Sequence, residues 1–178
     1  MKAAKVKTKG AIRYALVPSR LGAIFVAATD RGVCRLHFPA DDKTVRRFEK
    51  HYDRELAEDP EFLADVAGQL ESYLSGNLRK FDCNVDFIEG TEFQRKVWKA
   101  LLKIPYGETR SYQWMAERVG CPKGYRAVGG ANGSNPVSLI VPCHRVIGKD
   151  GSMTGYGGPS KKGQGTKRAL LRMEGAIG

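Results

Sequence analysis

The chain has 178 residues, of which 42% are hydrophobic and 28% charged, and its formal net charge is +11 at pH 7. This composition excludes an intrinsically disordered chain, and no apolar run approaches the ~18 residues that a membrane-spanning helix needs. Residues 1–10 are basic but no apolar stretch follows them, so we expect no secretory signal and a cytoplasmic protein whose four cysteines are reduced.

The charge is distributed unevenly between the two halves of the chain. Residues 1–90 contain 15 Lys and Arg against 14 Asp and Glu, a net charge of +1. Residues 91–178 contain 15 against 5, a net charge of +10. Because solubility alone does not require such an asymmetry, the second half is expected to bind a polyanion, most simply a nucleic acid.

The first half has the pattern of a small α+β domain. Runs of β-forming residues between turn sequences lie at 12–17, 23–29 and 33–38. Together they predict an antiparallel meander. Helical spacing predicts helices at 42–52 and 62–74, and strict alternation predicts a further strand at 81–87. Residues 1–90 show no catalytic pattern, so we expect this domain to act as a scaffold.

One possible metal site lies in the first half. Cys34 and His37 have ligand-like spacing, and His51 and Cys83 could complete a set of four. The spacing is loose, however, and Cys34 lies within a strand-like apolar run. We therefore expect no metal at these residues.

The second half, residues 91–178, begins with helix signals. Thr91 and Gln94 form a capping pattern for a helix that ends near residue 102. Ser111 can cap a helix at 112–119, and a turn with glycine separates it from a second helix at 125–132. The pair is either a helix-turn-helix or a plain helical hairpin. A turn at residues 149–152 predicts a β-hairpin after it, which would make the domain a winged helix.

The helix predicted at 125–132 has mostly small side chains and one long basic one, Arg126. A small face allows close approach to the DNA backbone, and a single arginine can enter the base stack. The other explanation is that Gly129 and Gly130 permit close packing against a second helix. Glycine costs ~1 kcal/mol inside a helix, so one of these reasons is required.

Residues 139–147 contain the strongest candidate for chemistry. Their aliphatic run predicts a buried strand. Cys143 within it is followed by His144 and Arg145, which favour a reactive thiolate; the alternative is an inert core cysteine. On a strand, neighbouring side chains point to opposite faces, so His144 would reach the thiol through a water or a chain turn. A thiolate beside a DNA-binding element predicts attack on an electrophilic, flipped-out base.

The sequence Pro142-Cys143-His144-Arg145 resembles the active-site signature of the O6-alkylguanine-DNA alkyltransferases, also called methylated-DNA–protein-cysteine methyltransferases. The other segments that match this family in order are residues 91–94, 97–98, 104–109, 111–113, 126–129, 135–136 and 170–175. The first half is similar to the alkyltransferase half of the bacterial adaptive-response proteins. The resemblance implies an α+β fold, with an RNase H-like domain at residues 1–90 and a winged helix-turn-helix domain at residues 91–178.

The resemblance implies a single-turnover repair reaction on double-stranded DNA, approached from the minor groove. Cys143 would take the alkyl group from O6 of a flipped guanine, or less readily from O4 of thymine. His144 would deprotonate Cys143 through a water and Glu174 would orient His144. Tyr112 would protonate the guanine at N3, and Arg126 would fill the gap in the stack. No cofactor is expected, because the lesion itself donates the alkyl group, and a monomer suffices.

Other residues take supporting roles by the same resemblance. Contacts with the duplex are implied for Tyr112, Arg126, Ala127, Gly129 and Arg145, and a place in the base pocket for Asn135, Val146, Tyr156 and Gly157. Asn135 would brace the turn before Cys143. The backbone carbonyls of Cys143 and Val146 would receive the guanine amine.

Two departures from the family pattern concern the lid of the pocket. An apparent insertion of about four residues falls near residues 163–165, and Gly157 stands where many members have a hydroxyl residue. Zinc, present in some relatives, is not expected here. Two alternative functions stay open: a lesion binder that does not transfer the alkyl group, and a regulator that responds to methylation.

Overall fold

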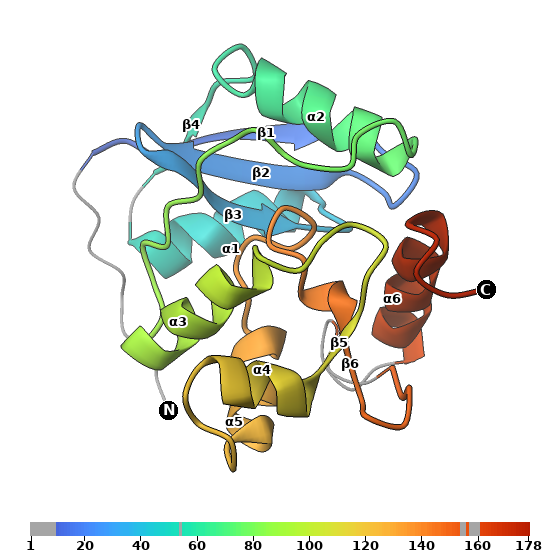
Figure 1. The fold of residues 1–178 in the computed structure, drawn as a ribbon. Coiled ribbons are helices and arrows are strands. Elements are labelled where there is room, and N and C mark those ends of the chain that lie inside the picture. The colour runs from blue at the N-terminus through green and yellow to red at the C-terminus, as the bar shows by residue number, and fades with distance from the viewer. Residues whose placement is uncertain (1–9, 54, 154–155, 157–160) are drawn as a thin grey trace. The chain divides into compact units, whose positions relative to one another are not determined.

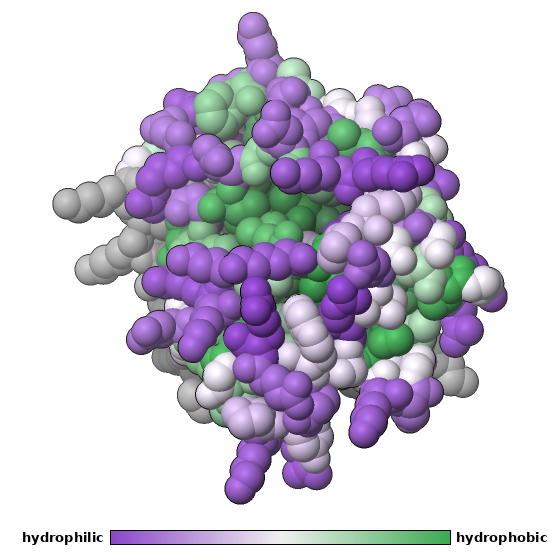
Figure 2. Space-filling view, viewed as in Figure 1, coloured by the Kyte–Doolittle hydropathy of each residue, from purple (hydrophilic) through white to green (hydrophobic). Residues whose placement is uncertain are grey.

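The computed structural model describes residues 10–53, 55–153, 156 and 161–178, and it forms two compact units, Met1–Glu89 and Gly90–Gly178 (Figure 1). In the described part of the chain, no helix has the length and apolar character needed to cross a membrane. Hydrophilic side chains cover most of the face shown in Figure 2, and hydrophobic ones reach it in smaller areas. The two units are described separately below.

The N-terminal unit is built on a four-stranded sheet in the order β3-β2-β1-β4. Its strands are β1 (Arg13–Val17), β2 (Ile24–Thr29), β3 (Gly32–His37) and β4 (Ala57–Glu58). The first three are antiparallel, which confirms the predicted meander, and β4 pairs in parallel with β1. The sequence did not predict β4, because it has two exposed residues and no hydrophobic alternation.

Helices α1 (Asp42–Tyr52) and α2 (Ala64–Leu74) lie on opposite sides of this sheet (Figure 1). The strand between them, β2, is buried at all six positions, as expected for a strand covered on both faces. On the α1 side, Phe25 stacks on Phe48 at a centroid distance of 4.9 Å, and Phe48 stacks on Tyr52 at 6.3 Å. A capping box between Asp41 and Thr44 begins α1, which starts at Asp42 as predicted.

Residues 81–87 do not form the predicted strand. The amide of Val33 donates to the carbonyl of Asn84 at 2.9 Å, and the amide of Asp86 donates to the carbonyl of Val33 at 2.9 Å. This single bridge to the start of β3 is the extent of the regular pairing. Alternation along a segment shows that its two faces differ, but it does not supply a neighbouring strand over its whole length.

The C-terminal unit contains four helices and a two-stranded parallel sheet in its described part. The helices are α3 (Glu92–Leu101), α4 (Tyr112–Arg118), α5 (Tyr125–Gly133) and α6 (Lys161–Met173), and the strands are β5 (Arg110–Ser111) and β6 (Val146–Ile147). Thr91 and Ser111 cap α3 and α4 as predicted. The indole Nε1 of Trp98 in α3 donates to the carbonyl of Ala131 in α5 at 2.7 Å. The helix-turn-helix is therefore packed onto α3, and the mixed α+β fold class is confirmed.

Three local predictions in this unit are wrong. The segment before Cys143 was predicted to be a buried strand or a core segment; it is buried, but it is not a strand, since Leu139 has a φ of +73° and residues Cys143–Arg145 form a 3₁₀ turn, η1. The turn at 148–152 forms through the bond from the amide of Gly148 to the carbonyl of Ser152, but β6 pairs with β5 rather than with a hairpin partner in the described residues. Residues 161–165 were expected to form a loop and the last helix to begin at Thr166, but α6 already begins at Lys161 and includes residues 163–165, where the apparent insertion falls.

Candidate active site

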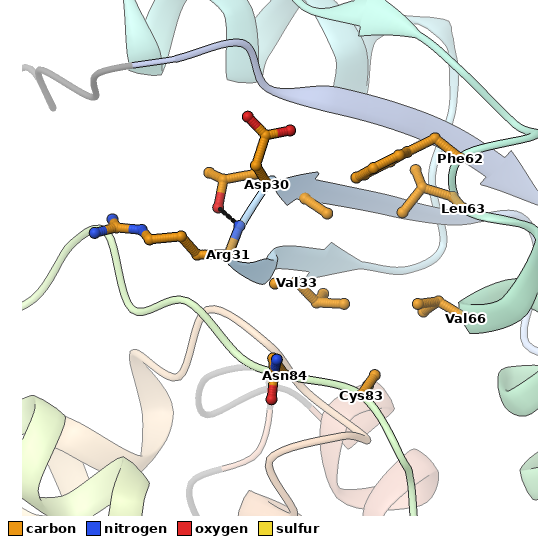
Figure 3. A pocket seen from close by; sticks show the side chains of 11 residues that line it. Asp30, Arg31, Val33, Phe62, Leu63, Val66, Cys83 and Asn84 are labelled. Atoms are coloured by element: carbon orange, nitrogen blue, oxygen red, sulfur yellow. Dashed lines mark hydrogen bonds between the residues drawn. The ribbon is translucent and has the colours of Figure 1, made fainter.

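The N-terminal unit contains an open pocket of about 190 Å³ (Figure 3). Phe62, Leu63 and Val66 form an apolar wall, and Cys83 and Asn84 lie along another part of the lining. Burial raises the pKa of the Cys83 thiol to about 11, so this thiol stays protonated and unreactive near neutral pH. The pocket therefore offers no activated nucleophile.

The residues considered for a metal site have other partners. The thiol of Cys34 donates to the carbonyl of Ala27 at 3.4 Å, and burial raises its pKa to about 12. His51 Nε2 lies 2.9 Å from a carboxylate oxygen of Glu89. Among the described residues, no three His, Cys, Asp or Glu side chains are grouped as metal ligands would be.

Buried polar side chains gather in the C-terminal unit instead. Those of the described residues in this unit are Asn132, His144, Arg145, Lys167 and Glu174. Lysine, arginine and glutamate are almost never fully buried unless they are paired, so this group marks a built site. Cys143 directly precedes two of them, His144 and Arg145, and is itself 3% exposed.

Cys143 is the first residue of η1, and its amide donates to the carbonyl of Val141 at 2.8 Å. We predicted that its basic neighbours would favour the thiolate. The structure corrects this, because burial raises the pKa of Cys143 above its ordinary value. The Asn135 and Ser138 side chains and the charge of Lys167 oppose that effect without reversing it. Cys143 is therefore a thiol at neutral pH and needs a base to become a nucleophile.

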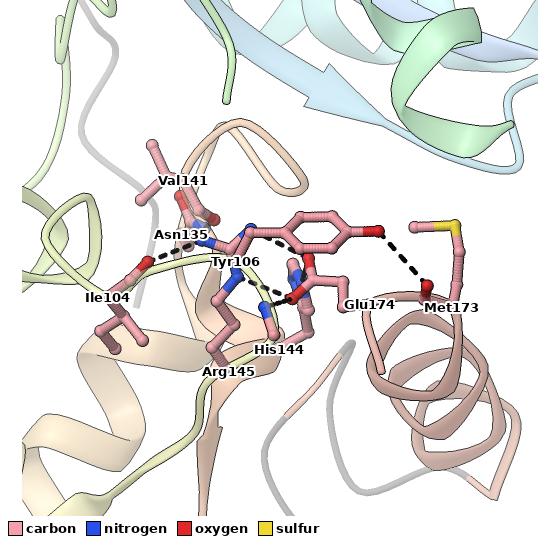
Figure 4. A network of polar contacts seen from close by, with 9 residues as sticks. Ile104, Tyr106, Asn135, Val141, His144, Arg145, Met173 and Glu174 are labelled. Atoms are coloured by element: carbon pink, nitrogen blue, oxygen red, sulfur yellow. Dashed lines mark hydrogen bonds and ion pairs between the residues drawn. The ribbon is translucent and has the colours of Figure 1, made fainter. Parts of the chain in front are cut away.

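His144 follows Cys143 in the chain, and it lies against Glu174, the residue directly after the end of α6 (Figure 4). His144 Nε2 lies 2.9 Å from Oε1 of Glu174, and both side chains are fully buried. Glu174 also receives the backbone amide of Gly107 at 3.3 Å. The 3₁₀ turn at Cys143 and the residue after α6 thus bring together a cysteine, a histidine and a glutamate, the residue types that can serve as nucleophile, base and orienter.

Arg145 does not lie where a DNA contact would require it. Its side chain is buried, its Nε and Nη2 donate to the two oxygens of Glu174 at 2.9 Å each, and its Nη1 donates to the carbonyl of Ile104 at 2.7 Å. Its guanidinium also lies 5.7 Å from the ring centroid of Tyr106. Because its donors are used inside the unit, we assign Arg145 to the support of Glu174 and withdraw the predicted contact with the duplex.

This arrangement sets the protonation of His144. Burial lowers the pKa of His144, the bond to Glu174 raises it, and the charge of Arg145 lowers it again, with a lowered value as the result. A neutral imidazole that faces an ionised carboxylate carries its proton on the nitrogen that faces it. His144 therefore donates from Nε2 to Glu174, and Nδ1 is the nitrogen that can accept a proton.

Lys167 is a member of the site that the sequence did not reveal. It is 0% exposed, its Nζ donates to the carbonyl of Val146 at 2.5 Å, and it lies 5.7 Å from the ring centroid of Tyr112. Burial lowers its pKa to about 8. In the sequence it stands in a run of basic residues that has the composition of a solvated helix face. The sequence offered one signal for its burial, the helical spacing of Lys167 relative to apolar residues. The residues at this spacing that are buried are Lys167, Leu170, Leu171 and Glu174.

The helix α5 presents a free small face. Arg126, Ala127 and Gly130 are exposed, and Gly129 is half-buried. A Cβ atom built at Gly130 would meet nothing within 4 Å, and one at Gly129 would meet only the Tyr112 ring at 4.0 Å. Packing against another helix therefore does not require either glycine, which leaves a close approach by an outside partner as the reason for them.

The predicted pocket residues have different degrees of support. Asn135 holds the turn before Cys143, since its Nδ2 donates to the carbonyl of Val141 at 2.8 Å and its Oδ1 accepts the amide of Val137 at 3.0 Å. Tyr156 is buried, with its ring centroid 6.3 Å from that of His144 in an edge-on arrangement. Gly157 lies outside the described residues.

Two family models match almost the whole chain. The ribonuclease-like domain of 6-O-methylguanine DNA methyltransferase matches residues 12–87, and the DNA binding domain of the same family matches residues 92–176. A methylated-DNA–protein-cysteine methyltransferase of Methanosarcina barkeri is 43% identical over 161 residues, which cover 90% of this chain and 96% of that protein. One of Mycobacterium tuberculosis is 54% identical over 116 residues, which cover 65% and 67%.

Solved structures agree with these matches. The crystal structure of the Mycobacterium tuberculosis O6-methylguanine methyltransferase is 41% identical, with a TM-score of 0.79 and coverage of 94% of each chain. A crystal structure of Mycobacterium tuberculosis OGT in complex with DNA is 41% identical, with a TM-score of 0.75 and coverage of 93% of this chain and 92% of that one. The sequence matches, the shared fold and the Cys143-His144-Glu174 arrangement agree, and the chain belongs to the 6-O-methylguanine DNA methyltransferase family.

Proposed function

We propose that this chain repairs DNA by moving the alkyl group of O6-alkylguanine onto its own Cys143, once per molecule. The observation that carries the proposal is a buried thiol held next to a histidine base and its carboxylate, in the same unit as a free small-faced helix. The relatives named above are methyltransferases that act on methylated DNA and a protein cysteine. The activity is therefore that of a methylated-DNA–protein-cysteine S-methyltransferase.

The chemical step needs no cofactor to balance. The thiol proton of Cys143 passes through a water to Nδ1 of His144, and Glu174 stabilises the imidazolium that forms. The sulfur attacks the alkyl carbon, a C–S bond forms, and the bond from that carbon to O6 breaks. The electron pair moves into the guanine ring, which takes a proton at N3 from the hydroxyl of Tyr112. The proton that His144 took is then returned to the Tyr112 phenolate through solvent, and the released base exchanges its N3 proton for the ordinary one at N1. The products are unmodified guanine and a stable thioether on Cys143.

The DNA is proposed to lie against α5. The exposed small residues Ala127 and Gly130, with Gly129 beside them, allow the minor groove to approach closely, and Arg126 takes the place of the nucleotide that leaves the stack. The flipped base then enters the site beside Cys143, with Asn135, Val146 and Tyr156 around it. We further propose that the protein acts as a monomer in the cytoplasm, where its four free thiols stay reduced.

Intact-protein mass spectrometry tests this proposal. After incubation with a duplex that contains O6-methylguanine, the chain is expected to gain the mass of one methyl group, located on the peptide with Cys143, and to show no second turnover. Cys143→Ala is expected to abolish the transfer. Cys121→Ala, which removes another free thiol of the same unit, is expected to leave it intact. Tight binding of the lesion without any mass gain by the unaltered chain would identify a lesion binder and reject the transferase.

A further inference from the structure

Tyr125, the first residue of α5, has an exposed aromatic ring. In the described part of the C-terminal unit, the large hydrophobic side chains that are exposed are those of Leu102 and Tyr125, and Tyr125 is 46% exposed. A single exposed aromatic residue is ordinary on a protein surface and needs no explanation by itself. The position of Tyr125 is what distinguishes it, because it directly precedes Arg126 on the helix that is proposed to meet DNA.

The guanidinium of Arg126 lies near this ring. Its Cζ atom is 5.9 Å from the ring centroid of Tyr125, within the distance of about 6 Å at which a cation–π contact is attractive. Neighbouring positions of a helix do not face each other, so the helix alone does not impose this approach. Among the residues that the structure describes, the Tyr125 ring supports the guanidinium, and none forms a hydrogen bond or an ion pair with it.

This kind of support leaves Arg126 able to act on a partner. A guanidinium has five N–H donors, and contact with an aromatic ring uses one of its flat faces but none of these donors. By contrast, the buried Arg145 spends its donors on Glu174 and on the carbonyl of Ile104. The donors and the other face of Arg126 stay available for bases and phosphates.

Order in the Arg126 side chain before DNA arrives has an energetic benefit. A free arginine side chain loses much rotamer freedom when it is fixed at a binding site, and this loss opposes binding. A contact that already restricts the side chain in the free protein reduces the loss. The ring of Tyr125 is placed to provide this restriction, since it lies on the same exposed turn of α5 as Arg126.

We propose that Tyr125 is a positioning residue for base flipping, whose ring keeps the Arg126 side chain ordered so that its guanidinium can replace the nucleotide that leaves the stack. The inference rests on the proposed function and deepens its DNA-binding step. Tyr125 acts through Arg126 and not on the alkylated base or on Cys143. The role requires an aromatic ring, whereas the tyrosine hydroxyl is dispensable.

The test presents one lesion in two settings. Single-turnover rate constants are measured below saturation, with O6-methylguanine in a duplex and in a single-stranded oligonucleotide. In the single strand no base pair is broken, so Arg126 has little to replace. Tyr125→Leu is expected to lower the ratio of the duplex to the single-strand rate constant about twofold to fivefold, the worth of an exposed cation–π contact. Tyr125→Phe retains the ring and is expected to keep the ratio of the unaltered chain.

The ratio separates positioning from support of the fold. Both rate constants come from one preparation, so a partly unfolded fraction cancels, and leucine is at least as good a helix former as tyrosine. The decisive variant is Arg126→Ala. When Tyr125→Leu is added to it, the ratio is expected to change no further, because the ring has no guanidinium left to hold.

Three results would overturn the inference. A twofold to fivefold loss from Tyr125→Leu that persists in Arg126→Ala would show that the ring contacts DNA directly. Equal losses in Tyr125→Phe and Tyr125→Leu would assign the effect to the hydroxyl. An unchanged or raised ratio in Tyr125→Leu would show that the ring does not assist Arg126. Failure of the unaltered chain to react with either substrate would instead overturn the proposed function.

Discussion

His144 and Arg145 bind the same buried carboxylate; burial lowers the pKa of His144, and the charge of Arg145 adds to this effect, so the histidine stays neutral. Glu174 receives two hydrogen bonds from the guanidinium and one from the imidazole, inside a region without solvent access. With its charge balanced by Arg145, Glu174 orients His144 but holds an extra proton on it only weakly. A neutral imidazole is the form that can accept the thiol proton of Cys143.

This pairing predicts the pH dependence of alkyl transfer. The pKa of His144 lies below its ordinary value of 6.5, so the base remains unprotonated, and the rate is maintained, to a pH below that value. The rate should fall only on further acidification, when His144 becomes charged. In Arg145→Gln the carboxylate loses its balancing charge, the pKa of His144 rises, and the acidic fall in rate moves to higher pH. Single-turnover rates between about pH 5 and 9 measure both profiles.

The midpoint of the acidic fall is the quantity to compare, because it does not depend on the fraction of folded protein. Loss of a buried ion-pair partner commonly costs about 3–5 kcal/mol, so Arg145→Gln will be less stable as well. Arg145→Lys retains the positive charge and is expected to bring the midpoint back toward that of the unaltered chain. An unchanged midpoint in Arg145→Gln would contradict the assigned role of Arg145.

At the level of single residues, the sequence indicated what is reactive better than what is buried. Cys143 was found from its motif, and His144 and Glu174 from the family resemblance, because these residue types are required by the chemistry. Arg145 and Lys167 were not recognised as interior residues. The composition of a basic half is the same whether its charged side chains pair inside the protein or face solvent. Only the fold decides between the two. Asn132 gave no signal at all beside Asn135.

The helix α5 is the element that most directly connects fold and function. It ends in a glycine-rich segment, yet the space beside Gly130 is empty and this position is exposed. A glycine that neither packs closely nor has a positive φ is a cost to the helix. Its small size is therefore useful only to a surface that meets α5 from outside.

Gly130→Ala separates stability from DNA binding. An exposed helical glycine costs about 1 kcal/mol relative to alanine, so the variant is expected to unfold at a higher temperature or denaturant concentration. The added methyl group is expected to weaken binding to lesion-containing duplex by about tenfold or more, through overpacking at the contact. Thermal unfolding and fluorescence anisotropy measure the two effects. Gly68→Ala in α2, another helical glycine with open space, should gain stability and bind DNA normally.

Elements with terminal signals or turns at both ends were predicted well, whereas residues 81–87 and the run before Cys143, read as strands from hydrophobicity alone, do not form strands. The capping residues Thr91 and Ser111 placed two helix starts correctly. The apolar run before Cys143 was read as a strand, but Pro142 and the two hydrogen bonds of Asn135 bend it into turns. Caps act within a few residues, whereas burial in a strand requires a partner that the local sequence does not specify.

On the scale of the whole molecule, the two units differ in net charge, and the positively charged unit is the one that holds the candidate active site. The net charge of +10 in residues 91–178 coincides with the unit that holds Cys143 and the helix-turn-helix, whereas residues 1–90 are close to neutral. Five of the buried polar side chains also belong to the second unit. Composition alone located the functional half, although it could not show which of its charges face solvent.

Binding to DNA is therefore expected to weaken steeply with salt. The logarithm of the association constant should fall linearly with the logarithm of salt concentration, by about 0.9 for each phosphate contact. Lys123→Gln, at the exposed turn between α4 and α5, is expected to reduce this slope by about one contact. Lys50→Gln, exposed at the end of α1, should leave the slope unchanged. Equal effects of the two substitutions would mean that the charge asymmetry does not locate the DNA.

The burial of Cys143 has a consequence for the spent molecule. Cys143, the proposed alkyl acceptor, is 3% exposed, so the alkyl group is added where other protein atoms surround it closely. Extra atoms in such an interior typically cost about 1–3 kcal/mol. In the proposed reaction, each repaired base therefore leaves one protein molecule with an alkyl group on a buried cysteine. The alkylated chain is therefore expected to be less stable than the unalkylated one.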